Sequence, residues 1–137
     1  MVAGSVVLTT STKGGLVAEY SLAWTSDAAG NVSGNSVDLR HGTVAAFTTL
    51  PGSGASAPTN LYDLKLLCDI HGVDILNDSG LNLSSTLGSH QAVFSYNADK
   101  SAYFRQFVHG GGYTLTITGA GATKSGIFDI YVSDSLF

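Results

Sequence analysis

The side chains with the most chemical potential in this chain are its histidines and its single cysteine. They are His41, Cys68, His71, His90 and His109. A zinc site is normally visible in a sequence as His and Cys residues at short, defined spacings, whereas these histidines follow one another at intervals of about 20 to 30 residues. The sequence therefore predicts no metal site, and only a meeting of these residues in three dimensions would create one.

Cys68 lies within the apolar run 64–70. A free cysteine in such surroundings usually behaves as a small hydrophobic residue of the core. One cysteine cannot form an intramolecular disulfide, which agrees with synthesis in a reducing compartment. We therefore expect a buried thiol at Cys68 rather than a nucleophile.

No pattern typical of an enzyme is found in the sequence. The Gly-x-Ser-x-Gly turn of many serine hydrolases is missing. Glycosidases need two carboxylates across a groove, but the chain has a single glutamate, Glu19, and its aspartates lie mostly at predicted turns. The His-Gly-Gly-Gly run 109–112 lacks the lysine and the helix of a phosphate-binding loop, and we interpret it as a turn between two strands. These patterns predict a non-enzymatic protein without catalytic residues or a cofactor.

Two further groups of residues have both a binding and a structural interpretation. Asp74, Asn77 and Asp78, with Asp69 nearby, carry oxygen ligands that would suit Ca²⁺, although capping of a hairpin end explains them better. Tyrosines in strands can stack on sugars, but packing in the core is their commoner role. The tyrosines concerned are Tyr62, Tyr96, Tyr103 and Tyr113.

Charge and hydropathy exclude several classes of partner. The net charge is −4, and the six basic residues are scattered along the chain, so no row of phosphates would be neutralised. No apolar run has the length of a membrane span, and the N-terminal apolar stretch lacks the basic residues and the length of a signal peptide. We expect no nucleic-acid or membrane partner, and synthesis in a cytoplasm without export.

The low charge favours contact with another protein. Charged residues make up 12% of the chain, about half the usual share. The polar surface must therefore consist largely of Ser, Thr, Gly and backbone groups. Such surfaces lose little when a partner covers them, and assembly into a larger structure is a natural use for them.

Short strands are the elements that must position all these residues. Tyr20, Leu22 and Trp24 alternate with polar residues, as do Tyr113, Leu115 and Ile117, so each set is expected to face a core. Strands are predicted over 6–10, 16–25, 37–50, 61–70, 73–76, 92–96, 102–108, 113–118 and 127–132. Residues 81–88 are left open between a short helix and a loop.

The strand pattern predicts an all-β fold. Two packed antiparallel sheets form a β-sandwich of eight or nine strands, with jelly-roll connections as one arrangement. Gly42 is the expected bend within 37–50. We expect one domain over residues 1–137, with an N-terminal arm over about residues 1–12 and a C-terminal tail over about residues 133–137.

The segment 51–60 holds both prolines of the chain and is the longest predicted loop. Loops of this length either make contacts or are crossovers between sheets, and the sequence does not separate these alternatives. The terminal Leu136 and Phe137 would be unfavourable in water. The predicted protein-contact residues are Pro51, Gly52, Ala57, Pro58, Leu136 and Phe137.

Three stretches carry a family resemblance: 24–34, then 57–63 leading into 69–76, and 119–126. Together they resemble a group of small β-rich structural proteins of tailed bacteriophages, in the same order and over most of the chain. Residues 81–101 depart from the pattern. The matching motifs consist of turn residues, so the resemblance implies kinship and supplies no functional residues.

The resemblance implies a bacteriophage virion structural protein without enzymatic activity. The leading expectation is a capsid decoration or cement protein that binds the shell of major capsid protein, or other virion proteins, as a homo-oligomer or symmetric multi-copy array. Its location would be the virion, assembled in the host cytoplasm. The alternatives are a neck or tail component, and a receptor- or glycan-binding module on the particle surface.

Overall fold

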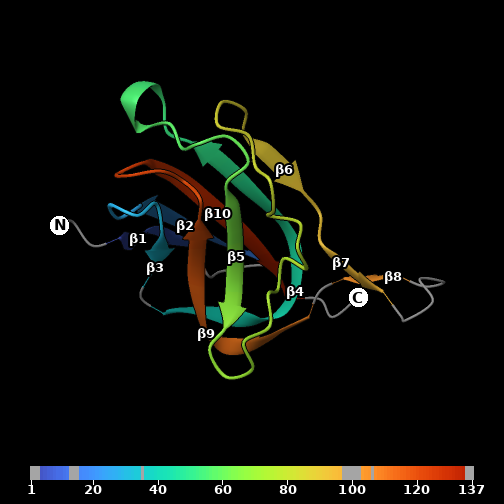
Figure 1. The fold of residues 1–137 in the computed structure, drawn as a ribbon. Coiled ribbons are helices and arrows are strands. Elements are labelled where there is room, and N and C mark those ends of the chain that lie inside the picture. The colour runs from blue at the N-terminus through green and yellow to red at the C-terminus, as the bar shows by residue number, and fades with distance from the viewer. Residues whose placement is uncertain (1–3, 13–15, 35, 97–102, 106, 135–137) are drawn as a thin grey trace.

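Ten strands and one short 3₁₀ helix form the described part of the computed structural model (Figure 1). The structure describes residues 4–12, 16–34, 36–96, 103–105 and 107–134. The strands are β1 (Ser5–Thr12), β2 (Val17–Thr25), β3 (Val32–Ser33), β4 (Val37–Pro51), β5 (Asp63–Cys68), β6 (Ser89–Gln91), β7 (Phe94–Tyr96), β8 (Tyr103–Arg105), β9 (Phe107–Thr118) and β10 (Ser125–Ser133). The helix η1 spans Gly54–Ser56. The predicted all-β fold is confirmed.

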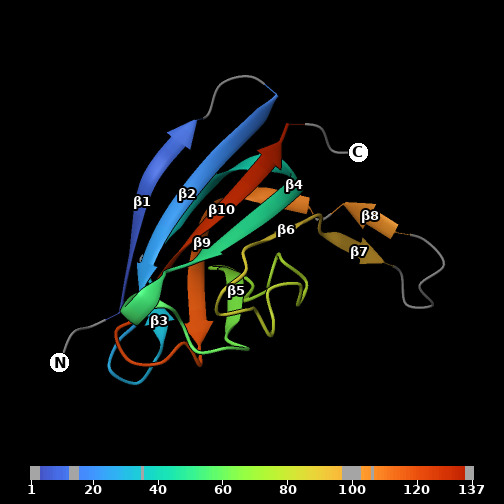
Figure 2. The same cartoon turned by 90° about the horizontal axis from the view of Figure 1, so that it is seen from above.

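Eight of these strands pair in one antiparallel sheet. Their order is β1-β2-β10-β4-β9-β3, with β5 added to β9 and β6 added to β4. Seen from above, β1, β2, β10 and β4 run side by side as one layer, and β9 and β5 lie across from them (Figure 2). The sheet is nearly closed and barrel-like. Strands β7 and β8 form a separate hairpin that projects from this body in both views (Figures 1 and 2).

The core lies between the two layers, where the alternation of apolar residues predicted it. Tyr20, Leu22 and Trp24 of β2 are buried, and so are the three apolar residues Tyr113, Leu115 and Ile117 of β9. Aromatic rings pack together in this core: the rings of Trp24 in β2 and Tyr62 just before β5, from opposite layers, are 5.7 Å apart, and those of Phe47 and Phe128, from the neighbouring strands β4 and β10, are 5.9 Å apart. Tilted pairs at these separations stabilise a core beyond simple burial.

Three loops pack together at one end of the sheet, and they belong to the three stretches that carry the resemblance. The backbone N–H of Thr59 donates to Ala120 O at 2.8 Å, and the Ala120 N–H donates to Gly30 O at 3.0 Å. Buried Ser26 joins the same cluster, because its hydroxyl donates to Gly121 O at 2.6 Å. The turn residues of these three stretches therefore build one structural unit.

The glycine run 109–112 is not the turn that the sequence predicted. It lies inside β9, which continues to Thr118. Gly110 and Gly111 have φ angles of +82° and +100°, which residues with a side chain rarely adopt. They bend the strand, so that its first half pairs with β4 and its second half with β5 and β3. The glycines thus form a corner of the sheet.

Other predicted boundaries also change. Residues 73–76 form no strand and pair through the single bridge between Leu67 and Asp74. Residues 5–12 are the edge strand β1 and not a free arm. Residues 81–88 contain no helix. Strand β4 is continuous through Gly42, where the bend was predicted. Gly42 lets β10 approach, because a Cβ there would meet Ser133 O at 1.8 Å.

Candidate functional site

Cys68, His71 and His109 lie together at the end of β5. The Sγ of Cys68 is 2.9 Å from His109 Nε2 and 3.5 Å from His71 Nδ1. The three potential ligand atoms all lie within 4.8 Å of one another. The two imidazole rings meet edge to face, with centroids 5.7 Å apart. We call these three residues the thiol–imidazole cluster.

A tight turn positions Cys68 and His71. Cys68 ends β5, and its backbone carbonyl accepts the N–H of Gly72 at 2.7 Å, while its own N–H donates to Val73 O at 2.9 Å. Gly72 adopts a φ of +69°, a conformation that glycine reaches without strain. The chain reverses over four residues, so that His71 returns to the thiol.

The bend in β9 supplies the third member. Cys68 pairs directly with Tyr113 across β5 and β9, and a regular strand would carry His109 away from that point. The positive φ angles of Gly110 and Gly111 change the direction of β9 between these two residues. The imidazole of His109 is thereby brought onto Cys68 and packs 5.5 Å from the Tyr113 ring.

Asp69 fastens the turn to the neighbouring strand. Its carboxylate accepts hydrogen bonds from the hydroxyls of Ser36 and of Thr114, the latter at 2.6 Å. Its backbone N–H donates to Gly112 O at 3.1 Å. The hydrogen bonds from Ser36 and then Thr114 lower the pKa of Asp69. The carboxylate therefore stays ionised and holds the turn in place.

The cluster favours a thiolate. The hydrogen bond with His109 is the largest cause that lowers the pKa of Cys68 to about 6, and further hydrogen bonds from His71 and from the backbone at Ile70 contribute. The same contact with Cys68 raises the pKa of His109. A thiolate beside an imidazolium is the form in which cysteine acts as a nucleophile or as a metal ligand.

A hollow of about 330 Å³ opens beside the cluster. Its other lining residues are Val73, Ile75, Phe107 and Tyr113. Phe107 and Val73 are about half exposed, so the hollow is reached from solvent. The hydroxyl of Tyr113 is buried and has no hydrogen-bond partner among the described residues. Burial is the main cause that raises the pKa of Tyr113, followed by the charge of Cys68.

Sequence reasoning missed this cluster. Cys68 is buried, as predicted, but it is not an inert hydrophobic residue, because both imidazoles contact its sulfur. No metal site was expected because the histidines are widely spaced in the sequence, but the fold brings two of them next to Cys68. The Cys-x-x-His spacing of Cys68 and His71 was the one signal for half of the cluster. Nothing local pointed to His109.

The other candidates keep their structural interpretation. The Asp74 carboxylate accepts the backbone N–H groups of Leu66, Leu76 and Asp78 at 3.1 Å each, as a capping residue does. Tyr62 and Tyr113 are buried in the core. The side chains of Tyr96 and Tyr103 lie outside the described part of the structure.

The predicted contact residues are not all at the surface. Pro58 is buried and Ala57 is half-buried, because the loop 51–60 is anchored at both ends by backbone hydrogen bonds from Gly52 and Thr59. Pro51 and Gly52, together with Leu50, line two hollows of about 350 and 340 Å³, and Ala57 lines the second. Leu136 and Phe137 lie outside the described residues.

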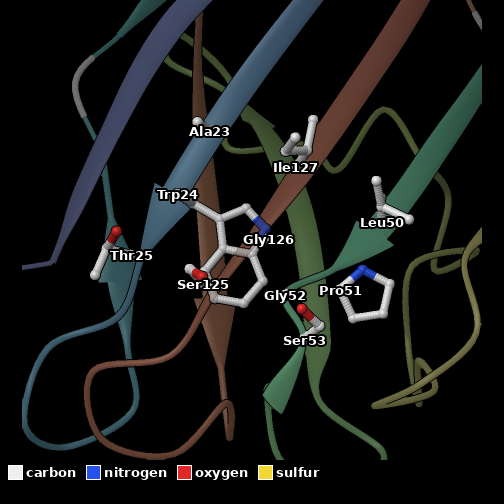
Figure 3. A pocket seen from close by; sticks show the side chains of 10 residues that line it. All are labelled: Ala23, Trp24, Thr25, Leu50, Pro51, Gly52, Ser53, Ser125, Gly126 and Ile127. Atoms are coloured by element: carbon white, nitrogen blue, oxygen red, sulfur yellow. The ribbon is translucent and has the colours of Figure 1, made fainter. Parts of the chain in front are cut away.

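A row of apolar side chains crosses the outer face of the sheet beside these hollows. The registers β1–β2, β2–β10 and β10–β4 align Val7 with Ala23, Ala23 with Ile127, and Ile127 with Leu50. Val7 is 57% exposed, Ile127 39% and Leu50 56%. Figure 3 shows the Ala23, Ile127 and Leu50 part of this row above Trp24 and Pro51. We call Val7, Ala23, Ile127 and Leu50 the apolar row.

No family model, no curated protein and no solved structure matches this chain. Among the described residues no helix has the length and apolar character needed to cross a membrane.

Proposed function

We propose that this chain is a non-enzymatic structural protein that binds another protein through the outer face of β1, β2, β10 and β4. The apolar row carries the proposal, because four aligned apolar side chains on a sheet face remain in water unless a partner covers them. Complete burial of an aliphatic side chain is worth about 1.5–3 kcal/mol. Covering the three exposed members of the row would therefore drive association.

Charge on the same face specifies the partner. The next outward row contains Asp129, which lies opposite Thr48, and the row after it contains Glu19 opposite Tyr131. The carboxylates of Asp129 and Glu19 make this part of the face acidic, and a partner surface of opposite charge would complement it. The expected partner surface is an apolar patch flanked by Arg or Lys.

The proposed identity of the partner rests on the family resemblance of the sequence. The resemblance to small structural proteins of tailed bacteriophages supports a virion protein, and the best candidate partner is the shell of major capsid protein. Repetition over a symmetric shell would add avidity to a modest single contact. In a neck or tail location the same face would bind a different partner. The copy number of the chain in the particle distinguishes this alternative from decoration of the shell. Of the tyrosines proposed for sugar stacking, Tyr62 and Tyr113 are buried, so this part of the chain offers no support for a glycan module.

Two measurements test the proposal. The first is the copy number of the chain in purified virions of the phage that encodes it. A number close to that of the shell subunit supports decoration, a few copies support a neck or tail location, and absence from the particle contradicts the proposal.

The second measurement is co-sedimentation of the purified chain with undecorated shells. Ile127→Asp and Leu50→Asp place a charge in the apolar row and should abolish binding. Ser33→Asp is the matched control, because Ser33 is an exposed strand residue in β3, outside the layer that carries the row. Equal binding by all three variants would exclude this face as the contact.

A further inference from the structure

We propose that the thiol–imidazole cluster is a Zn²⁺ site, in which the Cys68 thiolate and the imidazoles of His71 and His109 supply three ligands. The proposal concerns the chain itself and does not depend on any contact of the apolar row. The fourth position of the ion would face the hollow lined by Val73, Phe107 and Tyr113.

The two sulfur–nitrogen distances suit a tetrahedral ion after a small adjustment. Zinc bonds of about 2.3 Å to sulfur and 2.0–2.1 Å to nitrogen, at a tetrahedral angle, place sulfur and nitrogen about 3.6 Å apart. The Sγ of Cys68 and Nδ1 of His71 are already 3.5 Å apart. The sulfur and Nε2 of His109 form a direct hydrogen bond at 2.9 Å. This pair would separate by less than 1 Å when the ion replaces the shared proton.

The donor set selects the class of metal. One thiolate and two imidazoles are borderline-soft ligands, which suit Zn²⁺ and other late divalent ions. Mg²⁺ and Ca²⁺ require oxygen ligands, and the cluster contains none. The nearest carboxylate in the turn, Asp69, is engaged by Ser36 and Thr114. The cluster therefore discriminates against hard cations.

Groups around the cluster would hold the ligands in place. Asp69 fastens the turn that carries His71 to strand β9 through its hydrogen bond from Thr114, and the His109 ring packs against the Tyr113 ring. Three of four positions are thus provided by a framework that exists before the ion binds.

The hollow beside the cluster leaves room for a fourth ligand that does not come from the protein. Catalytic zinc sites keep one position for water, whereas purely structural sites fill all four with protein ligands. Here three protein ligands are present, and the fourth position would face a hollow whose rim residues Val73 and Phe107 are about half exposed, so that water reaches it. The site is therefore of the open type, and the ion would also tie the turn after β5 to β9.

The test uses the isolated chain without a histidine tag, freed of metal by a chelator. ZnCl₂ is titrated against a chromophoric competitor, and CoCl₂ is titrated while the absorption spectrum is recorded. We expect one ion per chain, a higher melting temperature with Zn²⁺, and a thiolate-to-Co²⁺ charge-transfer band. Cys68→Ser, His71→Gln and His109→Gln should each weaken Zn²⁺ binding by at least the 10–100-fold that loss of an outer-shell partner costs.

His90→Gln is the matched control. His90 is an exposed histidine of β6 that contacts Thr48 of β4 and lies outside the cluster. It should bind Zn²⁺ like the unaltered chain. If His109→Gln fails to fold, His71→Gln on its exposed turn still provides the test. Three outcomes would overturn the proposal: no binding, equal binding by the cluster variants and the unaltered chain, or Co²⁺ binding without the charge-transfer band. Because no shell is present, none of them bears on the contact proposed for the apolar row.

Discussion

The Sγ atom of Cys68 lies 2.9 Å from Nε2 of His109, although 41 residues separate them in the chain. The turn after β5 and the glycine bend in β9 meet at this point, and neither would produce the contact alone. A thiol and an imidazole at this distance share a proton, and each changes the acidity of the other. The reactivity of Cys68 therefore reports directly on the geometry of the cluster.

Alkylation of Cys68 should begin at a lower pH than that of an ordinary cysteine. The thiolate is the reacting form, and the contact with His109 lowers the pKa of Cys68 to about 6. In the presence of a chelator, the iodoacetamide rate should rise with a midpoint near pH 6, against about 8.5 for a free thiol. His109→Gln should move the midpoint upward, and His90→Gln should leave it unchanged. A midpoint above pH 8 in the unaltered chain would contradict the contact.

Ser26→Ala should destabilise the end of the sheet where three loops meet. The buried hydroxyl of Ser26 donates to Gly121 O at 2.6 Å and accepts the backbone N–H of Lys124 at 2.8 Å. Alanine would remove this partner from both of these part-buried backbone groups, which costs about 1–3 kcal/mol. Urea denaturation measures the free energy of unfolding, with the exposed Ser33→Ala as control. Equal stability of the two variants would show that water replaces the lost hydroxyl.

The side-chain pattern of the sequence predicted correctly those features that depend only on residues close together in the sequence. The alternation at Tyr20, Leu22 and Trp24 identified a buried face correctly, because side chains of a strand point to opposite sides in turn. The same local logic misplaced the run 109–112, since glycine marks bulges and bends within strands as well as turns.

The cluster itself could not be predicted in this way. It depends on the register that sets Cys68 opposite Tyr113, and register between strands so far apart in sequence is decided by packing of the whole sheet. The apolar row has the same origin: Val7, Ala23, Ile127 and Leu50 come from four strands. Each residue alone is an ordinary outward-facing strand residue, and only the sheet order places them side by side.

Thr123→Gly should stabilise the protein. Thr123 has a φ of +53° and is exposed in the loop between β9 and β10. A left-handed conformation costs a residue with a side chain about 1–2 kcal/mol, whereas the extra freedom of glycine in the unfolded chain costs roughly 0.5–1 kcal/mol. A net gain of up to about 1.5 kcal/mol in the free energy of unfolding is expected in denaturation. Thr86→Gly, at an exposed loop residue without positive φ, should lower stability instead. A loss at both positions would contradict the expected relief of strain.

Gly110→Ala tests whether the bend in β9 positions His109, as distinct from the general loss of stability that alanine causes at a positive φ. A Cβ at Gly110 would have its nearest neighbour, the backbone nitrogen of His41, at 3.5 Å, so the substitution acts through the φ of +82° rather than through a clash. Gly119→Ala is the matched control, since Gly119 has a φ of +73° and open space around it.

Both alanine variants should lose about 1–2 kcal/mol of stability. Only Gly110→Ala should also raise the alkylation midpoint of Cys68, because relaxation of its backbone turns β9 and moves His109 off the sulfur. If both variants leave that midpoint unchanged, the contact between Cys68 and His109 survives without the bend. The turn after β5 and the fastening through Asp69 would then be sufficient to hold the cluster together.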